Sequence, residues 1–375
     1  MGVPVAWKNV CQNKKRTLAA ASGISFALLL VFMQLGFLQG AKTAAASVFE
    51  LFHFDIAIVS EKYKFVGAPD SFDRMRLTQT MVVPEVEASA GMTMGRGTWT
   101  DPESESGNQL LLFSVPLDPL FIKDPAIRSG LETIRKNNTV MVDLYSHKEY
   151  GDLSIGREVE VNDLPVTIAS HFKLGVTLFS DGCVIVSKDG YDRLTKEPPR
   201  LTSYGFLRLR PGSDSEAVKK RLRGILPDDV LIFSRQEMIR QEQEYFISVK
   251  PIGIIFQTGV VVAFIVGVVI LFQVLNTDIS NRLKEFATFK AMGFKNGMIY
   301  GIGIEQALIY VLLSYFPSLI LATIVYRIVH RLSRMPMNMT FSLASFVLVM
   351  SLVMCAISCV LGLQKVRRAD PAELF

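Results

Sequence analysis

Four long apolar runs divide this chain of 375 residues. They cover residues 17–37, 252–275, 302–326 and 341–363. A helix needs about 20 residues to cross a hydrocarbon core of roughly 30 Å, and each run reaches that length. The pattern therefore predicts four transmembrane helices, separated by segments that are much more polar.

The first run has an alternative interpretation as a cleaved signal peptide. Lys14, Lys15 and Arg16 precede it and the small residues of AKTAAAS follow it, as in the charged region and cleavage site of such a peptide. Its apolar core is longer than the about 7 to 15 residues usual in signal peptides. A retained span is therefore favoured.

The long segment between the first two runs predicts a separate α+β domain at residues 56–233. Within it, GREVEVNDLPVTIAS alternates apolar and polar residues on both sides of Asn162 and Asp163. Such alternation around two turn-forming residues predicts a β-hairpin.

Residues 204–234 predict a strand, a helix and a second strand. Ser213 is expected to be the N-cap of this helix, with Glu216 completing a capping box. The helix is expected to bury one apolar face, made of Val218, Leu222 and Ile225.

The flanks of the first two spans predict helical extensions beyond the membrane. No proline interrupts the chain from Thr17 to about Phe54, which predicts one continuous helix. Residues 234–249 contain neither glycine nor proline and lead into the second span. We therefore expect the two extensions to form a stalk. The first span and its extension cover residues 17–55, and the second span and its extension cover residues 234–275.

Lysine and arginine in the short flanks predict the orientation. Eleven of them lie near the two ends of the chain or between the second and third spans, whereas Arg327, Arg331 and Arg334 lie near the turn between the third and fourth spans. This bias places both termini in the cytoplasm. The remaining predicted segments are an N-terminal segment (1–16) that is either an amphipathic surface helix or a charged flank, a cytoplasmic helix (276–300), the third span (301–328), an external turn (329–340), the fourth span (341–363) and a cytoplasmic tail (364–375).

The sequence contains no recognisable catalytic or nucleotide-binding motif. It lacks a GxxxxGK[ST] loop, a GxSxG elbow, an HExxH pair and any Cys/His cluster with metal-ligand spacing. We therefore expect no catalysis, no bound cofactor, no metal and no nucleic-acid partner for this chain. Cys355 and Cys359 share a face of the fourth span, where packing is favoured over metal binding or redox sensing.

Small residues recur at helical spacing in two of the spans. Gly259, Ala263 and Gly267 lie four residues apart in the second span, and Gly36 and Gly40 do so in the first. Stripes of this kind let helices approach closely in lipid. The pattern leaves open whether they pack within one protomer or across a dimer.

Glu305 lies near the cytoplasmic end of the third span. An ionisable residue is costly there, which makes it a candidate for function. The alternative is that Glu305 stays hydrated at the interface or pairs with a nearby basic residue.

A charged segment, RLKEFATFKAMGFKNGMI, separates the second and third spans at residues 282–299. Phe286, Phe289 and Gly293 recur at helical spacing, and charged residues occupy several of the other positions. A short amphipathic helix of this kind suits a groove on another protein. A helix lying on the lipid surface is the alternative, and the pattern alone leaves both open.

The same segment resembles the signature of the MacB/FtsX/LolE permease family, in which E-x-A/G-x-x-K/R-A-x-G recurs. The matching residues of this chain are Glu285, Ala287, Lys290, Ala291 and Gly293. The closing KVRRADPAEL also resembles the family's C-terminus, through Arg367, Arg368, Pro371 and Leu374.

The DevC-type permeases of cyanobacterial exporters are similar over nearly the whole chain. The resemblance includes VDLYSHKEYG in the external segment and SYFPSL in the third span. Phe286 and Phe289 depart from that group, which more often has Tyr and Leu there, and the turn around Arg331 is unusually basic.

The resemblance implies a homodimeric permease with four spans in each protomer. It also implies a location in the plasma membrane of a bacterium, specifically a cyanobacterium. The partners it implies are membrane lipid, a DevA-like ABC ATPase that binds ATP and Mg, a DevB-like periplasmic adaptor and a TolC-like outer-membrane channel. The implied cargo is lipid-like or amphiphilic, with glycolipid exported by one branch of the family. The residues expected to couple the permease to the ATPase are Glu285, Phe286, Ala287, Phe289, Lys290, Ala291, Met292 and Gly293.

One alternative function remains, an FtsX-like transmitter in which ATP-driven movement regulates an external enzyme and nothing crosses the membrane. The external domain predicted at residues 56–233 favours export, because FtsX has a similar architecture but a smaller external domain.

Overall fold

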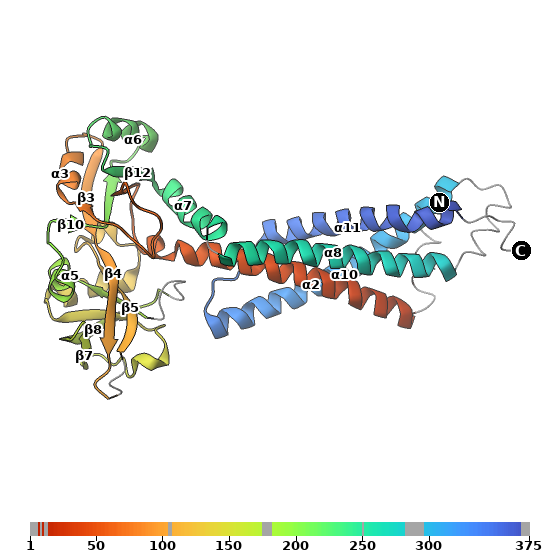
Figure 1. Cartoon of the computed structure of the whole chain (residues 1–375), viewed down its shortest axis with the longest axis horizontal. Helices are drawn as coiled ribbons and strands as arrows, with labels where there is room; N and C mark the ends of the chain where they lie inside the picture. Colours follow the sequence, from red (N-terminus) through yellow and green to blue (C-terminus); the bar gives the residue numbers. More distant parts are fainter. Residues whose placement is uncertain are drawn as a thin grey trace, which may run out of the picture. The chain divides into compact units, whose positions relative to one another are not determined.

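A computed structural model describes residues 7, 10, 14–103, 107–174, 182–249, 251–281 and 296–368. The chain divides into two compact units, and Figure 1 labels many of their helices and strands. Unit 1 contains residues 1–40 and 251–375, and unit 2 contains residues 41–250.

Four long apolar helices supply unit 1: α2 (Lys14–Ala45), whose last five residues belong to unit 2, α8 (Pro251–Asn281), α10 (Asn296–Ser333) and α11 (Phe341–Arg368). Within the described ranges, each contains a stretch that is long and apolar enough to cross a membrane. An α+β domain lies between the first and second of these helices. The predicted fold class is therefore confirmed.

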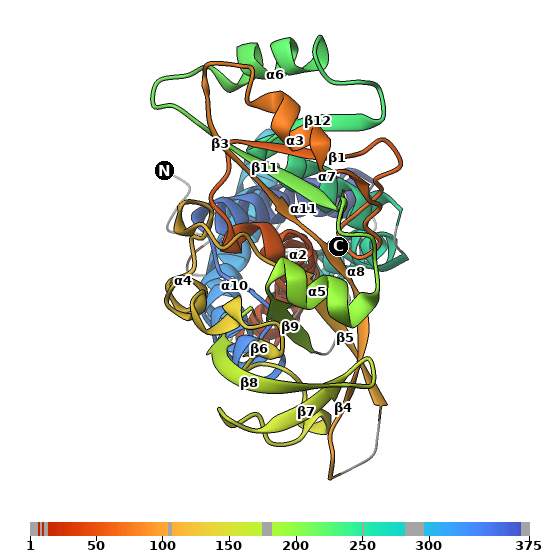
Figure 2. The same ribbon diagram turned by 90° about the vertical axis from the view of Figure 1, so that its left-hand side faces the viewer.

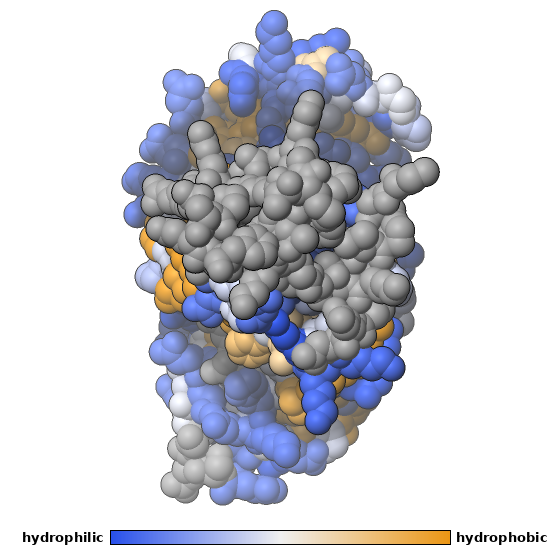
Figure 3. All heavy atoms as spheres, turned by 90° about the vertical axis from the view of Figure 1, so that its right-hand side faces the viewer, coloured by the Kyte–Doolittle hydropathy of each residue, from blue (hydrophilic) through white to orange (hydrophobic). Residues whose placement is uncertain are grey.

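The helices of unit 1 have apolar side chains both between them and on their outward faces. Their common core includes Leu28 and Phe32 of α2, Leu271 of α8, Tyr315 of α10 and Val347 of α11. Large apolar side chains that remain exposed include Val261, Ile265, Phe316, Ile320 and Phe346. Hydrophobic side chains also reach the surface in the end-on view of Figure 3. Exposed apolar area on this scale is unfavourable in water but not against lipid chains.

The expected continuous helix from Thr17 to Phe54 is wrong. Helix α2 ends at Ala45, and Ser47–Leu51 form a 3₁₀-helix, after which Phe52 is extended. A 3₁₀-helix brings residues i and i+3 to the same side. This places Val48 above Leu51, and both are buried in the core of unit 2. Core packing therefore overrides the helical tendency of this segment.

The second predicted extension is helical, as α7 (Arg235–Ser248), but α7 and the second span are separate helices. Helix α7 ends before Pro251, which opens α8. Proline suits the first position of a helix, where its missing N–H is not needed, but it cannot continue the hydrogen-bond ladder of a preceding helix.

The turn predicted at residues 329–340 is shorter than expected. Helix α10 continues to Ser333, so Arg331 is helical, and Arg334 has a left-handed backbone with φ of 55° that ends the helix.

A four-stranded antiparallel sheet forms the first part of unit 2, in the order β12-β1-β11-β3. The strands are β1 (Ile56–Ser60), β3 (Val86–Met92), β11 (Tyr204–Leu209) and β12 (Val230–Ser234). Helices α3 (Met75–Thr80) and α6 (Ser215–Arg223) lie beside this sheet in Figure 2 and share a buried cluster with it, through Leu77 and Leu222. Met238 of α7 joins a separate cluster, with Phe206 of β11.

The predicted strand, helix and strand at residues 204–234 are confirmed as β11, α6 and β12, with two corrections. The N-cap is Asp214 rather than Ser213, because the Asp214 carboxylate accepts a hydrogen bond from the Glu216 N–H at 3.0 Å. Ile225 is exposed, and Leu226 is buried in its place. The helix ends at Arg223, so helical spacing no longer decides which of these side chains faces the core.

A closed six-stranded barrel, in the order β4-β5-β9-β6-β8-β7, forms the second part of unit 2 (Figure 2). Its strands are β4 (Met94–Thr100), β5 (Gly107–Ser114), β6 (Thr139–Asp143), β7 (Glu158–Val161), β8 (Leu164–Phe172) and β9 (Cys183–Val186). The predicted hairpin is confirmed between β7 and β8, where Asn162 and Asp163 have φ of 51° and 61°. Positive φ at both turn residues suits the twist of the strands. The smaller elements are β2 (Phe72–Asp73), β10 (Leu201–Thr202), α4 (Pro125–Gly130) and α5 (Lys188–Thr195).

Glu242 is a buried acid on α7, with no exposed surface. One carboxylate oxygen accepts a hydrogen bond from the Tyr63 hydroxyl, and the other accepts one from the Val66 N–H at 2.9 Å. Burial disfavours the charged form and raises the pKa of Glu242 from 4.5 to about 7. Tyr204 contacts the Tyr63 ring edge-on beside this pair. The carboxylate thus holds α7 to residues 63–66.

The raised pKa predicts that unit 2 becomes more stable as the pH falls from about 7 toward 4.5, because the folded state then binds a proton that the unfolded chain does not. Glu242→Gln should remove this dependence, which amounts to about 3 kcal/mol across the window. The measurement is thermal unfolding of the full-length chain in detergent, with Trp7 replaced by phenylalanine, followed by emission of Trp99, which is fully buried in unit 2. Glu244→Gln, an exposed change on the same helix, is the control. An unaltered pH dependence in Glu242→Gln would contradict the assignment.

Candidate functional site

Asp278 is the charged residue of the apolar helix α8, three residues before the helix ends at Asn281. Only 7% of it is exposed. A buried carboxylate among apolar helices is costly unless it is paired and hydrogen-bonded. Its surroundings therefore need to supply both a positive charge and hydrogen-bond donors.

Three side chains from two other helices satisfy the Asp278 carboxylate. Arg16, in the first turn of α2, forms a salt bridge with Oδ1 at 2.5 Å. On α10, the Gln306 amide donates to Oδ2 at 2.7 Å and the Tyr310 hydroxyl donates to the same oxygen at 2.8 Å. We refer to Arg16, Asp278, Gln306 and Tyr310 as the Asp278 cluster.

Helical spacing explains how α10 supplies two donors to one oxygen. Gln306 and Tyr310 are four residues apart and therefore lie on the same face of the helix. Both are buried, with 5% and 2% of their surfaces exposed. Arg16 keeps about a third of its side chain accessible, although its Nη2, which faces Asp278, is buried.

The Asp278 cluster lies on both sides of the charged segment in the sequence. Helix α8 ends at Asn281 and α10 begins at Asn296, so residues 282–295 connect the two helices that hold Asp278, Gln306 and Tyr310. Arg16 adds α2 to the same network. A displacement of residues 282–295 would therefore act on α8 and α10, and Asp278 of α8 is bonded to Arg16 of α2.

The predicted coupling residues lie outside the described part of the chain: Glu285, Phe286, Ala287, Phe289, Lys290, Ala291, Met292 and Gly293. Pro371 of the tail does too, whereas Arg367 and Arg368 form the end of α11.

Glu305 lies beside Gln306 on α10 but does not join the Asp278 cluster. It is partly buried, and its Oε2 is enclosed without a hydrogen-bond partner in the ranges that the structure describes. The two neighbouring polar residues of α10 therefore differ in their surroundings, because Gln306 is bonded and one carboxylate oxygen of Glu305 is not.

The small residues of α8 lie against other helices of the same chain. A Cβ on Gly259 would come within 2.5 Å of Gln34 on α2, and one on Gly267 would meet Met354 of α11. Ala263, between them, is buried in the core of unit 1. On α2, Gly36 gives room to the ring of Tyr326. Close approach of α8 to α2 and α11 within one protomer thus depends on these positions.

Cys355 and Cys359 are buried in the apolar core of unit 1, and both are free thiols. Over the described ranges, no group of three or more His, Cys, Asp or Glu side chains is placed to hold a metal ion.

Sequence reasoning missed every member of the Asp278 cluster. The usable signal was the single acidic residue at the end of an apolar span, together with two polar residues four apart at the start of the next. Arg16 was counted only for its charge, because nothing in the pattern joins it to a residue 262 positions away.

Comparisons with known proteins place the Asp278 cluster, apart from Arg16, in a recognised domain. Residues 258–371 match the FtsX-like permease C-terminal domain, a region that also contains residues 282–295. No curated protein sequence matches the chain.

Among solved structures, the chain is similar to the periplasmic region of MacB from Actinobacillus actinomycetemcomitans, with 10% identity and a TM-score of 0.37 over 52% of this chain and 94% of that one. It is also similar to the extracellular domain of the noncanonic ABC-type transporter YknZ from Gram-positive bacteria, with 12% identity and a TM-score of 0.33 over 48% of this chain and 98% of that one.

The geometry predicts energetic coupling between Arg16 and Asp278. Asp278→Ala should destabilise the chain by roughly 2 to 4 kcal/mol, because it leaves the Gln306 and Tyr310 donors without their acceptor. Combining it with Arg16→Ala should cost at least about 1 kcal/mol less than the sum of the single changes. The measurement is a double-mutant cycle on the detergent-solubilised chain, unfolded by titration with a denaturing detergent. Lys15→Ala, an exposed neighbour, is the control and should be additive with Asp278→Ala. Additivity of Arg16→Ala would contradict the pairing.

Proposed function

Because the chain belongs, through residues 258–371, to the FtsX-like permeases, we propose that it is the permease subunit of an ATP-driven exporter that moves a lipid-like or amphiphilic substrate across the bacterial envelope. The wider family of ABC-type permeases, MacB/FtsX/LolE, works with an ABC ATPase. The sequence contains no Walker A motif, so in this proposal ATP and Mg bind to a separate subunit.

The observation that carries the proposal is that Asp278 precedes residues 282–295 in the sequence and that Gln306 and Tyr310 follow them. A movement of this connection, driven by the ATPase, acts directly on the end of α8 and the start of α10. The salt bridge from Asp278 to Arg16 passes the same movement to α2. Helix α2 contains residues of both units, and α8 follows α7 of unit 2 closely in the chain. We propose that these two helices carry the movement to unit 2.

The rest of the proposed assembly follows from the resemblance to DevC-type exporters. It comprises a homodimer of this chain, a DevA-like ATPase, a DevB-like periplasmic adaptor and a TolC-like outer-membrane channel. The excess of lysine and arginine on one side supports cytoplasmic termini and an external unit 2. Glycolipid is the cargo to test first, because the DevC resemblance extends over nearly the whole chain.

The proposal predicts that Phe289→Asp separates the permease from its ATPase. In the predicted helix, Phe289 shares an apolar face with Phe286. Burying one such ring stabilises a contact by roughly 1.5 to 3 kcal/mol, and an unpaired charge in an apolar groove adds a further cost. We therefore expect the retained ATPase to fall about tenfold or more, since 1.4 kcal/mol corresponds to a factor of ten. The measurement is the ATPase-to-permease ratio after purification through a tag on the permease.

Thr288→Asp is the matched control, because it adds the same charge at the residue before Phe289, which helical spacing directs away from the face that the two phenylalanines share. It should keep the ATPase and export at the level of the unmodified chain. Wild-type ATPase retention by Phe289→Asp, with ATP hydrolysis still linked to transport, would overturn the coupling assignment. Poor membrane insertion of Phe289→Asp, with the surviving protein still bound to the ATPase, would instead favour a helix resting on lipid.

A further inference from the structure

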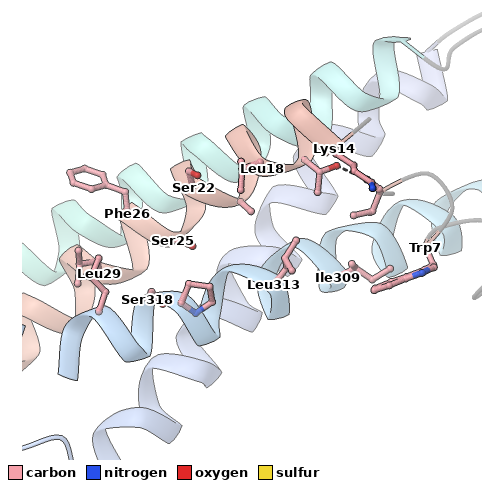
Figure 4. A pocket seen from close by; sticks show the side chains of 15 residues that line it. Trp7, Lys14, Leu18, Ser22, Ser25, Phe26, Leu29, Ile309, Leu313 and Ser318 are labelled. Carbon is pink, nitrogen blue, oxygen red and sulfur yellow. Dashed lines mark hydrogen bonds between the residues drawn. The ribbon is translucent and has the colours of Figure 1, made fainter. Parts of the chain in front are cut away.

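A long groove of about 660 Å³ runs between α2 and α10 in unit 1 (Figure 4). Figure 4 shows Lys14 and Trp7 at one end of it and Phe26 and Leu29 at the other. The lining residues on α10 are Ile309, Leu313, Pro317, Ser318 and Leu321.

Helical spacing explains which residues of α10 line the groove. Ile309, Leu313 and Leu321 are separated by multiples of four residues, so they form a ridge along α10. The lining of α2 extends from Lys14 to Leu29, which corresponds to about 22 Å at 1.5 Å per residue. One leaflet contributes about 15 Å of hydrocarbon, half of the usual core thickness. The groove is thus long enough for a chain that crosses one leaflet and for a headgroup contact beyond it.

The wall of the groove is apolar even where it contains hydroxyl groups. The Ser25 hydroxyl donates to the Ser314 carbonyl at 3.0 Å, and the Ser318 hydroxyl donates to the Tyr315 carbonyl at 2.7 Å. Two of the three serines in the lining, Ser25 and Ser318, are therefore already bonded within the protein. A hydrocarbon chain fits this surface better than a cargo rich in hydroxyl groups, which would find few partners.

One end of the groove carries a positive charge. Lys14 lines it, and no carboxylate in the described part of the chain lies within salt-bridge distance of Lys14. Arg16 is directed instead to Asp278. Trp7 lies at the same end with more than half of its surface exposed, and tryptophan is enriched where membrane meets water. The charge and the apolar wall are complementary to a lipid with an anionic headgroup.

We propose that this groove binds one acyl chain of an anionic glycerophospholipid from the surrounding leaflet, with the lipid phosphate contacting Lys14. The site lies along the outer surface between α2 and α10, so it is accessible from the bilayer without opening the helix bundle. It is a site for a lipid of the host membrane, independent of the exported cargo.

Emission from Trp7 offers a direct test, because the other tryptophan, Trp99, is fully buried in unit 2. The intact chain is reconstituted in phosphatidylcholine vesicles that contain a small fraction of phosphatidylglycerol with brominated acyl chains. A parallel series contains brominated phosphatidylcholine. Bromine quenches tryptophan emission only at short range. If the groove prefers the anionic lipid, brominated phosphatidylglycerol should therefore quench Trp7 more strongly than brominated phosphatidylcholine does. We expect a preference of about fivefold, the effect of one lysine near an anionic headgroup.

Two pairs of variants separate the site from general attraction to the membrane. Lys14→Gln should abolish the preference for phosphatidylglycerol, whereas Lys15→Gln, which does not line the groove, should keep it. Ser22→Phe should fill the groove and reduce quenching by phosphatidylglycerol to the level of phosphatidylcholine. Ala19→Phe, an exposed position of α2 outside the groove, should not.

Equal quenching by the two lipids in the unmodified chain would overturn the proposal. The proposal would also be overturned if Lys14→Gln and Lys15→Gln reduced the preference for phosphatidylglycerol equally. The same holds for Ser22→Phe and Ala19→Phe, because the contact would then be unspecific. Quenching of Trp7 that weakens as the protein-to-lipid ratio rises would contradict the proposal and assign the groove to a second copy of the chain. No quenching by either lipid would contradict it too and assign the groove to an occupant other than phospholipid.

Discussion

The buried carboxylate of Asp278 is the constraint on which the arrangement of unit 1 depends. A charge removed from water between apolar helices is tolerated only while its partners remain in place. Arg16, Gln306 and Tyr310 supply those partners from two different helices. Apolar packing tolerates small sliding movements, but three polar contacts to one carboxylate do not. The cluster therefore fixes the ends of α2, α8 and α10 relative to one another.

Packing along the rest of the helices complements this fixed point. Gly259 and Gly267 bring α8 against α2 and α11, and Gly36 brings α2 against Tyr326 of α10. The Tyr326 hydroxyl also donates to the Phe32 carbonyl of α2. The Ser25 hydroxyl of α2 donates in turn to the Ser314 carbonyl of α10, and the Asp278 cluster joins the two helices indirectly, through α8. A helix held at these three levels moves as a unit, which suits the transmission of movement in the proposed exporter.

Much of the architecture follows from local sequence patterns, and the errors have local physical causes. The four spans and the Asn162–Asp163 hairpin depend on apolar length and on turn residues that tolerate positive φ. The end of α2 at Ala45 could not be predicted in this way, because the next residues leave the helix to reach the core of unit 2. Closure of the barrel depends on parallel pairing of β5 with β9 and of β6 with β8, contacts between strands that are distant in the sequence. The Asp278 cluster was missed for the same reason, since its ion pair joins the first span to the second.

The central claim is that the Asp278 cluster passes movement from residues 282–295 to α2. Hydrogen exchange on the reconstituted permease–ATPase complex tests it most directly, with amides of residues 14–25 and 282–295 compared before and after binding of a non-hydrolysable ATP analogue. In the unmodified complex, both regions should change their exchange rates. In Asp278→Asn, which removes the charge but keeps a similar shape, residues 282–295 should still respond and residues 14–25 should not. An unchanged response of residues 14–25 in Asp278→Asn would contradict the account.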